Sequence, residues 1–144
     1  MVNVRVYRAP TLVKMSPDFS PCPCGSGAVL SACCGRWHVG PLRLQAPDAA
    51  ALMRSRYSAY ALGRLDYLLD TWHPSTRPAS LDPMPPGLKW LGLELRARVA
   101  THADAATVEF VARSKLAGKA HRLHEISRFT REAGQWWYVD GQIL

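Results

Sequence analysis

The chain has 144 residues, of which 48% are hydrophobic and 20% are charged, and its formal net charge is +7. This length accommodates one compact domain with a small appendage, and this composition excludes an intrinsically disordered protein. No apolar run approaches the roughly 18 residues of a membrane-spanning helix, and the N-terminus has no signal peptide, so we expect a cytoplasmic protein that does not contact a membrane.

The basic excess is concentrated at the start of the chain. Arg5, Arg8 and Lys14 precede Met15, and residues 1–15 are expected to be a leader, with Met15 as the alternative to Met1 as the start. Without these three charges the net charge falls from +7 to +4, which is ordinary for a soluble domain. The other basic residues are scattered among acidic ones without a run or stripe, so binding to RNA or the ribosome ranks last among the functions considered.

All four cysteines lie in one window, 22–34, which reads Cys22-Pro23-Cys24-Gly25-Ser26-Gly27 and then, after five residues, Cys33-Cys34. Adjacent cysteines, and cysteines one residue apart, do not easily reach the geometry of an unstrained disulfide. Zinc, by contrast, takes four thiolates in a tetrahedron, and a glycine-rich turn allows both pairs to face one point. We therefore predict that residues 16–40 form a module around one structural Zn²⁺, against the alternative of four small buried thiols in an ordinary core.

The predicted zinc ligands are Cys22, Cys24, Cys33 and Cys34. His38 lies close enough in the sequence to be an alternative fourth ligand in place of Cys34. Four thiolates saturate a zinc ion and leave no position for a reactive water, so we expect this metal to stabilise structure and to perform no hydrolysis.

Two helices are predicted after a linker at 41–47. The first opens at Pro47-Asp48 and stops at Gly63. The second covers about 64–72 and ends before His73-Pro74. The first helix presents one largely apolar face at steps of three and four residues, namely Ala49, Leu52, Met53, Arg56, Tyr57, Tyr60 and Ala61. In the second helix the residues expected to be buried are Leu65, Leu68, Leu69 and Trp72.

Alternating apolar and polar residues predict four strands after an irregular, proline-rich segment at 75–88. The first strand is expected to present Leu91, Leu93, Leu95, Ala97 and Val99 on one face. The others are expected near 105–115, 120–131 and 135–144, joined by short links such as Ala133-Gly134 that suit hairpins. Helices followed by an antiparallel meander predict an α+β fold in which the helices cover one face of a curved sheet.

The cysteine window resembles the SEC-C motif, the zinc-binding tail first known from a bacterial translocation motor. The resemblance implies that the four cysteines are the metal ligands. It departs from the family pattern at Ala28-Val29-Leu30-Ser31, where relatives usually carry lysines around an aromatic residue. Any docking function that depends on those lysines is therefore expected to be weaker in this chain.

The chain from Cys22 to Gly141 resembles the bacterial YchJ family, in which a SEC-C motif precedes a cone-shaped domain like nuclear transport factor 2, also described as cystatin-like. This resemblance implies that residues 48–144 form such a cone with a cavity between helices and sheet. Many members end in a second SEC-C motif, which is absent before Leu144. The family supplies no established activity. The segments that carry the resemblance are Leu52-Met53-Arg54-Ser55-Arg56-Tyr57, Asp66-Tyr67-Leu68, Thr71-Trp72-His73-Pro74, Trp90-Leu91-Gly92-Leu93, Phe110-Val111-Ala112-Arg113, Glu125-Ile126-Ser127-Arg128-Phe129 and Gly134-Gln135-Trp136-Trp137-Tyr138-Val139-Asp140-Gly141.

Two charged residues fall on predicted apolar faces, Arg56 on the first helix and Glu125 on the third strand. A charge in such a place is costly unless it is paired, so we expect Arg56 and Glu125 to pair with each other, or with Asp140 or Arg54. The alternative is that these residues bind a ligand. The candidate pocket residues are Arg56, His73, Trp90, Glu125, Ser127 and Tyr138.

The leading functional hypothesis is a zinc-binding adaptor whose cone binds a protein partner or a small ligand. By resemblance, the partner would be a protein of the ribosome, of the chaperones or of the translocation machinery, as distinct from RNA itself, and a homodimer through the open sheet face is a further expectation. The alternative is an isomerase-like or dehydratase-like cavity enzyme with Glu125 as general base and His73 as a second, weaker catalytic candidate. No nucleophile elbow, phosphate loop or metalloprotease motif supports other chemistry.

Overall fold

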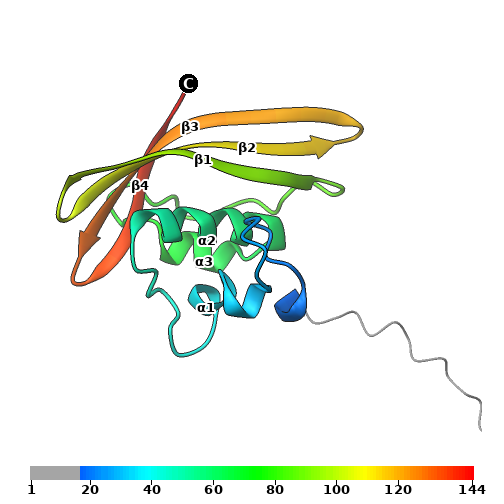
Figure 1. The fold of residues 1–144 in the computed structure, drawn as a ribbon. Coiled ribbons are helices and arrows are strands. Elements are labelled where there is room, and N and C mark those ends of the chain that lie inside the picture. Colours follow the sequence, from blue (N-terminus) through cyan, green and yellow to red (C-terminus); the bar gives the residue numbers. More distant parts are fainter. Residues whose placement is uncertain (1–16) are drawn as a thin grey trace, which may run out of the picture.

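The computed structural model describes residues 17–144, and the predicted leader at 1–15 lies outside them. A long antiparallel sheet forms one layer, two helices pack beneath it, and the cysteine-containing segment lies on the far side of the helices (Figure 1). No helix among the described residues has the length and apolarity needed to cross a bilayer. The elements are η1 (Pro17–Phe19), η2 (Leu30–Ala32), α1 (Gly35–His38), α2 (Ala49–Leu62), α3 (Leu65–Asp70), β1 (Lys89–His102), β2 (Ala105–Leu116), β3 (Lys119–Glu132) and β4 (Gln135–Ile143).

Helix α2 is central to this arrangement, and its ends are those that the sequence predicts. The side chain of Asp48 accepts a hydrogen bond of 2.7 Å from the backbone N–H of Ala51, which caps the N-terminus. Gly63 takes a left-handed conformation, φ 70°, and ends the helix. The helix is buried on two sides. Leu52 and Tyr57 face the sheet, while the Ser58 hydroxyl contacts Cys22 and the backbone carbonyl of Ser55 accepts a hydrogen bond from His38.

Helix α3 is shorter than predicted, because it ends at Asp70 and leaves Trp72 outside it. Its buried residues are Tyr67 and Leu68, whereas Leu65 and Leu69 are only partly buried. The segment after α3 runs along β4, where Trp72 and Tyr138 form a parallel bridge. The N–H of Tyr138 donates to the carbonyl of Thr71 at 2.9 Å, and the N–H of His73 donates to the carbonyl of Tyr138 at 2.7 Å.

The four strands form one antiparallel meander in the order β1-β2-β3-β4, as predicted. Two of the turns are Ala117-Gly118 and Ala133-Gly134, in which both central residues have positive φ of 50° and about 76–77°. This is the backbone of the two-residue hairpin turn that matches the twist of its strands. The fold class is α+β, as the order of elements predicts.

The predicted single apolar face of β1 is wrong. Leu91 is 58% exposed and Val99 is 52% exposed, while Leu93 and Leu95 pack on the core. Irregular pairing between Trp90 and Gly92, and again between Leu95 and Ala97, marks β-bulges. Because a bulge inserts one extra residue, it reverses which side chains point to the core, so Trp90 and Arg98 lie on the inner face.

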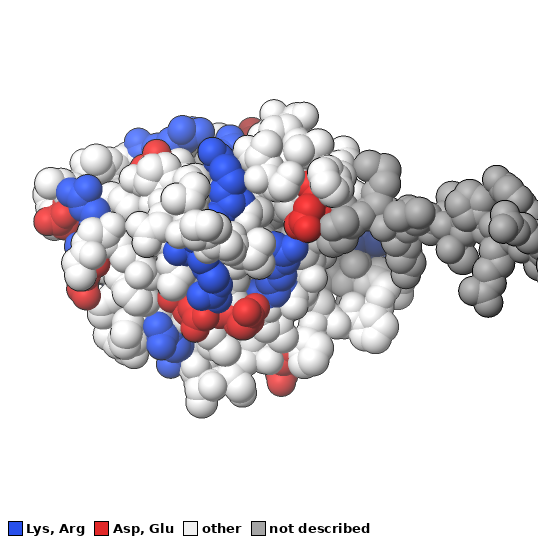
Figure 2. Space-filling model, turned by 90° about the horizontal axis from the view of Figure 1, so that it is seen from below, with Lys and Arg blue, Asp and Glu red and all other residues white. Residues whose placement is uncertain are grey.

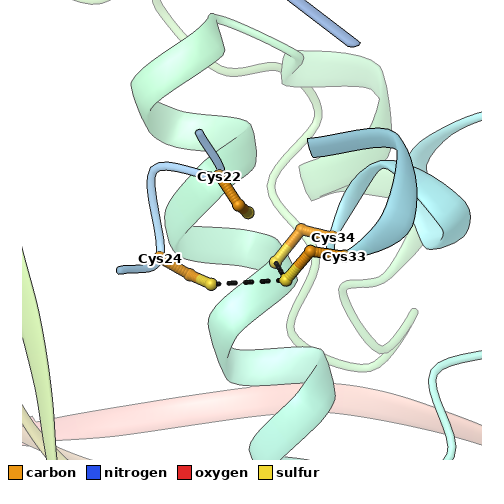
Figure 3. Close-up of side chains that lie close together, drawn as sticks. All are labelled: Cys22, Cys24, Cys33 and Cys34. Carbon is orange, nitrogen blue, oxygen red and sulfur yellow. Dashed lines mark hydrogen bonds between the residues drawn. The ribbon is translucent and has the colours of Figure 1, made fainter. Parts of the chain in front are cut away.

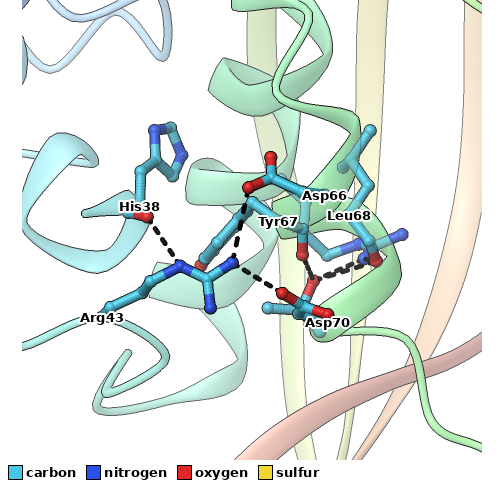
Figure 4. A network of polar contacts seen from close by, with 8 residues as sticks. His38, Arg43, Asp66, Tyr67, Leu68 and Asp70 are labelled. Carbon is cyan, nitrogen blue, oxygen red and sulfur yellow. Dashed lines mark hydrogen bonds and ion pairs between the residues drawn. The ribbon is translucent and has the colours of Figure 1, made fainter.

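The predicted linker at 41–47 is packed against the domain. Ala46 is buried, and Leu44 packs on the core although its φ is 66°. Arg43 donates from Nε to the carbonyl of His38 at 3.0 Å and contacts Asp70 at 2.7 Å, as Figure 4 shows. A single guanidinium thus fixes the cysteine module to α3.

Candidate metal centre and ligand cavity

The four cysteine sulfurs lie within 4.8 Å of one another and point to one place beside α2 (Figure 3). The Sγ atoms of Cys24 and Cys33 are 3.6 Å apart, and those of Cys33 and Cys34 are 4.0 Å apart. An ion bound tetrahedrally at a typical Zn–S distance of about 2.3 Å would separate its sulfurs by about 3.8 Å. The spacing and the soft donor set therefore fit a metal centre held by Cys22, Cys24, Cys33 and Cys34.

Glycines shape the backbone that brings the two cysteine pairs together. Gly25 and Gly27 have φ of 80° and 86°, a region that other residues rarely adopt. The N–H of Cys22 donates to the carbonyl of Ala28 at 2.8 Å and closes this turn. After the second pair, a Cβ on Gly35 would lie 2.7 Å from the carbonyl oxygen of Leu30, so only glycine allows that close approach.

Two serine hydroxyls lie next to the sulfurs. Ser26 Oγ is 3.1 Å from Cys33 Sγ, and Ser58 Oγ, from α2, is 3.4 Å from Cys22 Sγ. Hydrogen bonds from Cys24 and Cys34 lower the pKa of the Cys22 thiol, and the same sharing with Cys22 raises the pKa of Cys34. Thiolates this close together repel one another, and a bound cation would relieve that repulsion.

Both ring nitrogens of His38 have partners outside the cysteine cluster, so His38 is not a ligand. Its ring is 2% exposed, Nε2 donates to the carbonyl of Ser55 at 2.7 Å, and Nδ1 accepts from Arg64 at 3.0 Å. Burial lowers the pKa of His38 and keeps the imidazole neutral. Cys34, which is 2% exposed, completes the cluster instead.

A cavity of about 310 Å³ lies between α2 and the inner face of the sheet. Five of the six predicted pocket residues line it: Arg56, Trp90, Glu125, Ser127 and Tyr138. Seven lining residues were not predicted as part of a pocket. Met53, Tyr57 and Tyr60 were assigned only to the apolar face of the helix, and Phe110, Ala112 and Leu123 only to the sheet. Met84 comes from the proline-rich segment at 75–88, which has no periodic pattern to indicate its place. The full lining is Met53, Arg56, Tyr57, Tyr60, Met84, Trp90, Phe110, Ala112, Leu123, Glu125, Ser127 and Tyr138.

Glu125 is the acidic residue of this otherwise mostly apolar lining. Its Oε1 accepts hydrogen bonds from Ser127 at 3.2 Å and from Tyr138 at 3.5 Å. Desolvation raises the pKa of Glu125 against the opposing effect of these two hydroxyls, and burial raises the pKa of Tyr138 to about 12. Among residues 17–144 no donor lies within hydrogen-bonding distance of Oε2, so this oxygen is the polar atom that a ligand in the cavity would meet.

Gly141 provides the space for this carboxylate. It lies on β4 beside Ser127, and a Cβ at this position would fall 1.5 Å from Glu125 Oε1. The sequence gives no sign of this role, because a glycine within a strand indicates only close approach of some neighbour.

The predicted ion pair of Arg56 is wrong. Arg56 is 3% exposed and donates from one nitrogen to the carbonyl of Leu68 and to Thr71 Oγ1, both at 2.7 Å. Its guanidinium carbon lies 4.3 Å from the ring centre of Tyr138 and 5.1 Å from that of Trp72. A backbone carbonyl, a hydroxyl and two aromatic faces therefore balance this charge. The proposed partner Asp140 binds Arg128 on the surface, while Arg54 reaches the carbonyl of Cys24.

His73 lies outside the cavity, contrary to the prediction. Its Nε2 donates to the carboxylate of Glu132 at 3.0 Å, and its Nδ1 accepts from the N–H of Ser75 at 3.1 Å. Its ring meets the edge of Trp137, with ring centres 6.1 Å apart. These contacts fix the segment after α3 to the β3–β4 hairpin, and the described structure gives His73 no access to the groups around Glu125.

The fold and the four-cysteine cluster define a class of protein, a SEC-C module packed on a nuclear transport factor 2-like (NTF2-like) domain. The family description "YchJ, middle NTF2-like domain" matches residues 48–141, and the SEC-C motif matches residues 20–36. The chain belongs to the YchJ family, whose relatives carry the name UPF0225 proteins.

The relatives are similar over almost their whole length. A UPF0225 protein of Methylibium petroleiphilum is 65% identical over 123 residues, which cover 85% of this chain and 88% of the relative. One from Bordetella parapertussis is 58% identical over 129 residues, covering 88% and 97%.

Two solved structures are similar to this chain, and both are described as SEC-C motif containing proteins. The solution structure from Rhodopseudomonas palustris has a TM-score of 0.69 and 32% identity and covers 85% of this chain and 98% of its own. The crystal structure from Psychrobacter arcticus has a TM-score of 0.74 and 27% identity and covers 90% and 86%.

Proposed function

We propose that this protein binds a small, mainly apolar ligand in the cavity under its sheet and uses one Zn²⁺ only to fix its N-terminal module. The observation that carries the proposal is the position of Glu125, a desolvated carboxyl in a cavity of about 310 Å³ that is otherwise mostly apolar. Ligand sites in proteins combine such an apolar lining with a few polar groups that orient the ligand.

The assignment of zinc rests on the donor set. Four thiolates select a soft or borderline cation, and their closed arrangement on Cys22, Cys24, Cys33 and Cys34 suits the four-coordinate structural sites of zinc. Such a site persists where thiols stay reduced, which supports a cytoplasmic location. The ion would neutralise the clustered thiolates and hold the two chain segments together.

The lining indicates the chemistry of the ligand. Aromatic and aliphatic side chains would surround an apolar body, and the free oxygen of Glu125 would accept a hydrogen bond from an amine or hydroxyl group. Arg56 lines the same cavity, but its hydrogen bonds to Leu68 and Thr71 already engage it. We therefore expect a donor-bearing ligand to bind better than an acidic one.

A matched ligand series tests this proposal. Phenylethylamine, phenylethanol and phenylpropionate share an apolar body. Their binding is measured by calorimetry and by the change in tryptophan fluorescence, to which Trp90 in the cavity lining contributes. The amine and the alcohol are expected to bind more tightly than the acid, and Glu125→Gln is expected to remove the advantage of the amine. Ala112→Phe places a large side chain in the cavity lining while Glu125 is kept, and it is expected to remove binding of all three. Unchanged binding by both variants would contradict the proposal.

A cavity enzyme remains the second candidate, and the raised pKa of Glu125 favours it. A carboxyl in this environment suits a general base, and Tyr138, within 3.5 Å, suits a hydrogen-bond donor to a developing oxyanion. His73 has no part in it, because it contacts Glu132 instead. A reaction that survives Glu125→Gln, in a screen of isomerase and dehydratase substrates, would exclude this mechanism. A partner from the ribosome, a chaperone or the translocation machinery stays a prediction of the family resemblance.

A further inference from the structure

Strand pairing gathers basic residues that are far apart in the sequence at one end of the sheet. Lys89 lies directly opposite Lys115, and Arg113 lies directly opposite Arg122. Lys119 is the first residue of β3, directly after the Ala117-Gly118 turn. We call Lys89, Arg113, Lys115, Lys119 and Arg122 the basic sheet end. A sequence scan misses it, because the five residues belong to three strands.

The main part of this cluster points away from the helices. Phe110 and Ala112 line the cavity, so the alternate residues Val111, Arg113 and Lys115 point to the outer face of the sheet. Register places Lys89 and Arg122 on that same face, over which no described element packs (Figure 1). On the opposite, helix-side view, acidic side chains lie next to many of the basic ones (Figure 2).

The charge of the basic sheet end is almost unbalanced. Among residues 17–144, only Glu94 is within 4 Å of it, at 3.6 Å from Arg113, and Glu94 is shared with Arg96 at 3.5 Å. Five cations and this one carboxylate give +4, which equals the formal charge of the whole described chain, because three of the +7 charges precede residue 17. The remaining described residues are therefore neutral in sum.

Like charges placed directly opposite each other on neighbouring strands destabilise a sheet. Two such pairs side by side are the arrangement expected when an external anion supplies the missing charge. The exposed end is also poor in the apolar groups that form the centre of protein–protein interfaces, since Leu91 is its only large exposed hydrophobic residue. Among its described residues this end presents no exposed Phe, Tyr or Trp side chain on which an unpaired base would stack, and its exposed ring is the small imidazole of His121.

We propose that the basic sheet end binds the phosphodiester backbone of double-stranded nucleic acid, by charge and without reading sequence. Cations that alternate along a strand recur about every 6.6 Å, and cross-strand partners double each of them, which suits a regular row of phosphates. None of the five residues lines the cavity, so this proposal is independent of the ligand-binding proposal and is tested separately.

The test measures binding of the full chain to a 16-base-pair RNA duplex, and to DNA of the same sequence, by fluorescence anisotropy at several salt concentrations. The slope of log affinity against log salt is negative. For Lys115→Gln/Arg122→Gln we expect its magnitude to decrease by about two, one for each lost phosphate contact. The matched control is Arg77→Gln/Arg98→Gln, which removes the same charge from exposed positions elsewhere. It is expected to keep the slope, and the basic N-terminal residues are common to both variants.

Each outcome bears on the proposal. A decrease in the salt dependence of binding that is larger in the first double variant than in the control supports it. Equal losses in both double variants, an unchanged slope, or no binding of either duplex overturns it. Poly-glutamate or anionic lipid vesicles that displace the duplex at matched charge would also overturn it, in favour of an acidic protein or a membrane surface.

Discussion

The position of Glu125 on β3 depends on Gly141 on β4, because the two residues are in close contact. The carboxylate occupies the space in which any other residue at 141 would place its Cβ. Glycine is thus required for the polar group of the cavity and for no turn, since Gly141 is not among the glycines with positive φ.

Gly141→Ala is expected to lower the free energy of unfolding by about 1–3 kcal/mol, because Glu125 must leave its position. Urea denaturation measures this change. Gly92→Ala, on β1, is the matched control, because nothing lies within 4 Å of its added Cβ. In a Glu125→Ala background the cost of Gly141→Ala should largely disappear, and an additive cost would show that the two residues are independent.

Glu125 also predicts how stability depends on pH. Its pKa in the folded protein is raised above the ordinary value of 4.5, so between these two values the folded protein binds more protons than the unfolded chain. Stability from this group is therefore present at acidic pH and is lost as the pH rises through that window. Glu125→Gln stays neutral, so its stability relative to the natural protein should increase from pH 4.5 to 7. A difference that does not change with pH would contradict the raised pKa.

Among the secondary-structure elements, the sequence predicts those whose signals are local. Asp48 and Gly63 mark the two ends of α2 because a cap and a left-handed residue act within one turn. The bulges of β1 could not be predicted, because they arise from pairing with β2 and reverse the side-chain pattern after Leu95. The surroundings of Arg56 could not be predicted from the sequence, for a similar reason. Electrostatics alone favours an acidic partner, and the aromatic faces of Trp72 and Tyr138 come from two other segments.

Arg56 links three elements, since it extends from α2 to the carbonyl of Leu68 on α3 and to the ring of Tyr138 on β4. Arg56→Ala should lower the free energy of unfolding by about 3 kcal/mol or more. The substitution creates a cavity, and it removes the hydrogen-bond donor of a buried carbonyl. Thermal and urea denaturation measure the change. Arg54→Ala, whose single bond to Cys24 is 3.4 Å long, should cost less than about 1 kcal/mol. Similar costs at the two positions would show that the buried contacts of Arg56 add nothing.

At the scale of the whole molecule, the cysteine module and the cone share a continuous interior through α2. Cys22 contacts Ser58, Leu62 packs on the cysteine cluster, and His38 binds the backbone of Ser55. The sequence predicts the module, its ligands and the cone separately. The way they pack together depends on small polar residues of α2, which carry no pattern that indicates a second buried face.

This shared interior predicts that metal removal destabilises the entire protein. A chelator, or Cys22→Ser, should lower the melting temperature in a single transition, in which helical circular dichroism and tryptophan fluorescence change together. The chelator effect should be reversed by added zinc. Two separate transitions, with the sheet melting at its original temperature, would show that the module is an independent appendage.

The segment that follows α3 has a consequence for the behaviour of the protein at high concentration. Strands at the edge of a sheet expose unpaired N–H and C=O groups that invite other chains to join, and this leads to aggregation. Residues 71–76 cover part of one edge, because Thr71, His73 and Thr76 bond to the backbone of β4 at Tyr138 and Val139. The opposite edge, β1, is interrupted by bulges and carries Glu94, Arg96 and Arg98. The two edges of this sheet are thus protected by different means, one by its own chain and the other by irregularity and charge.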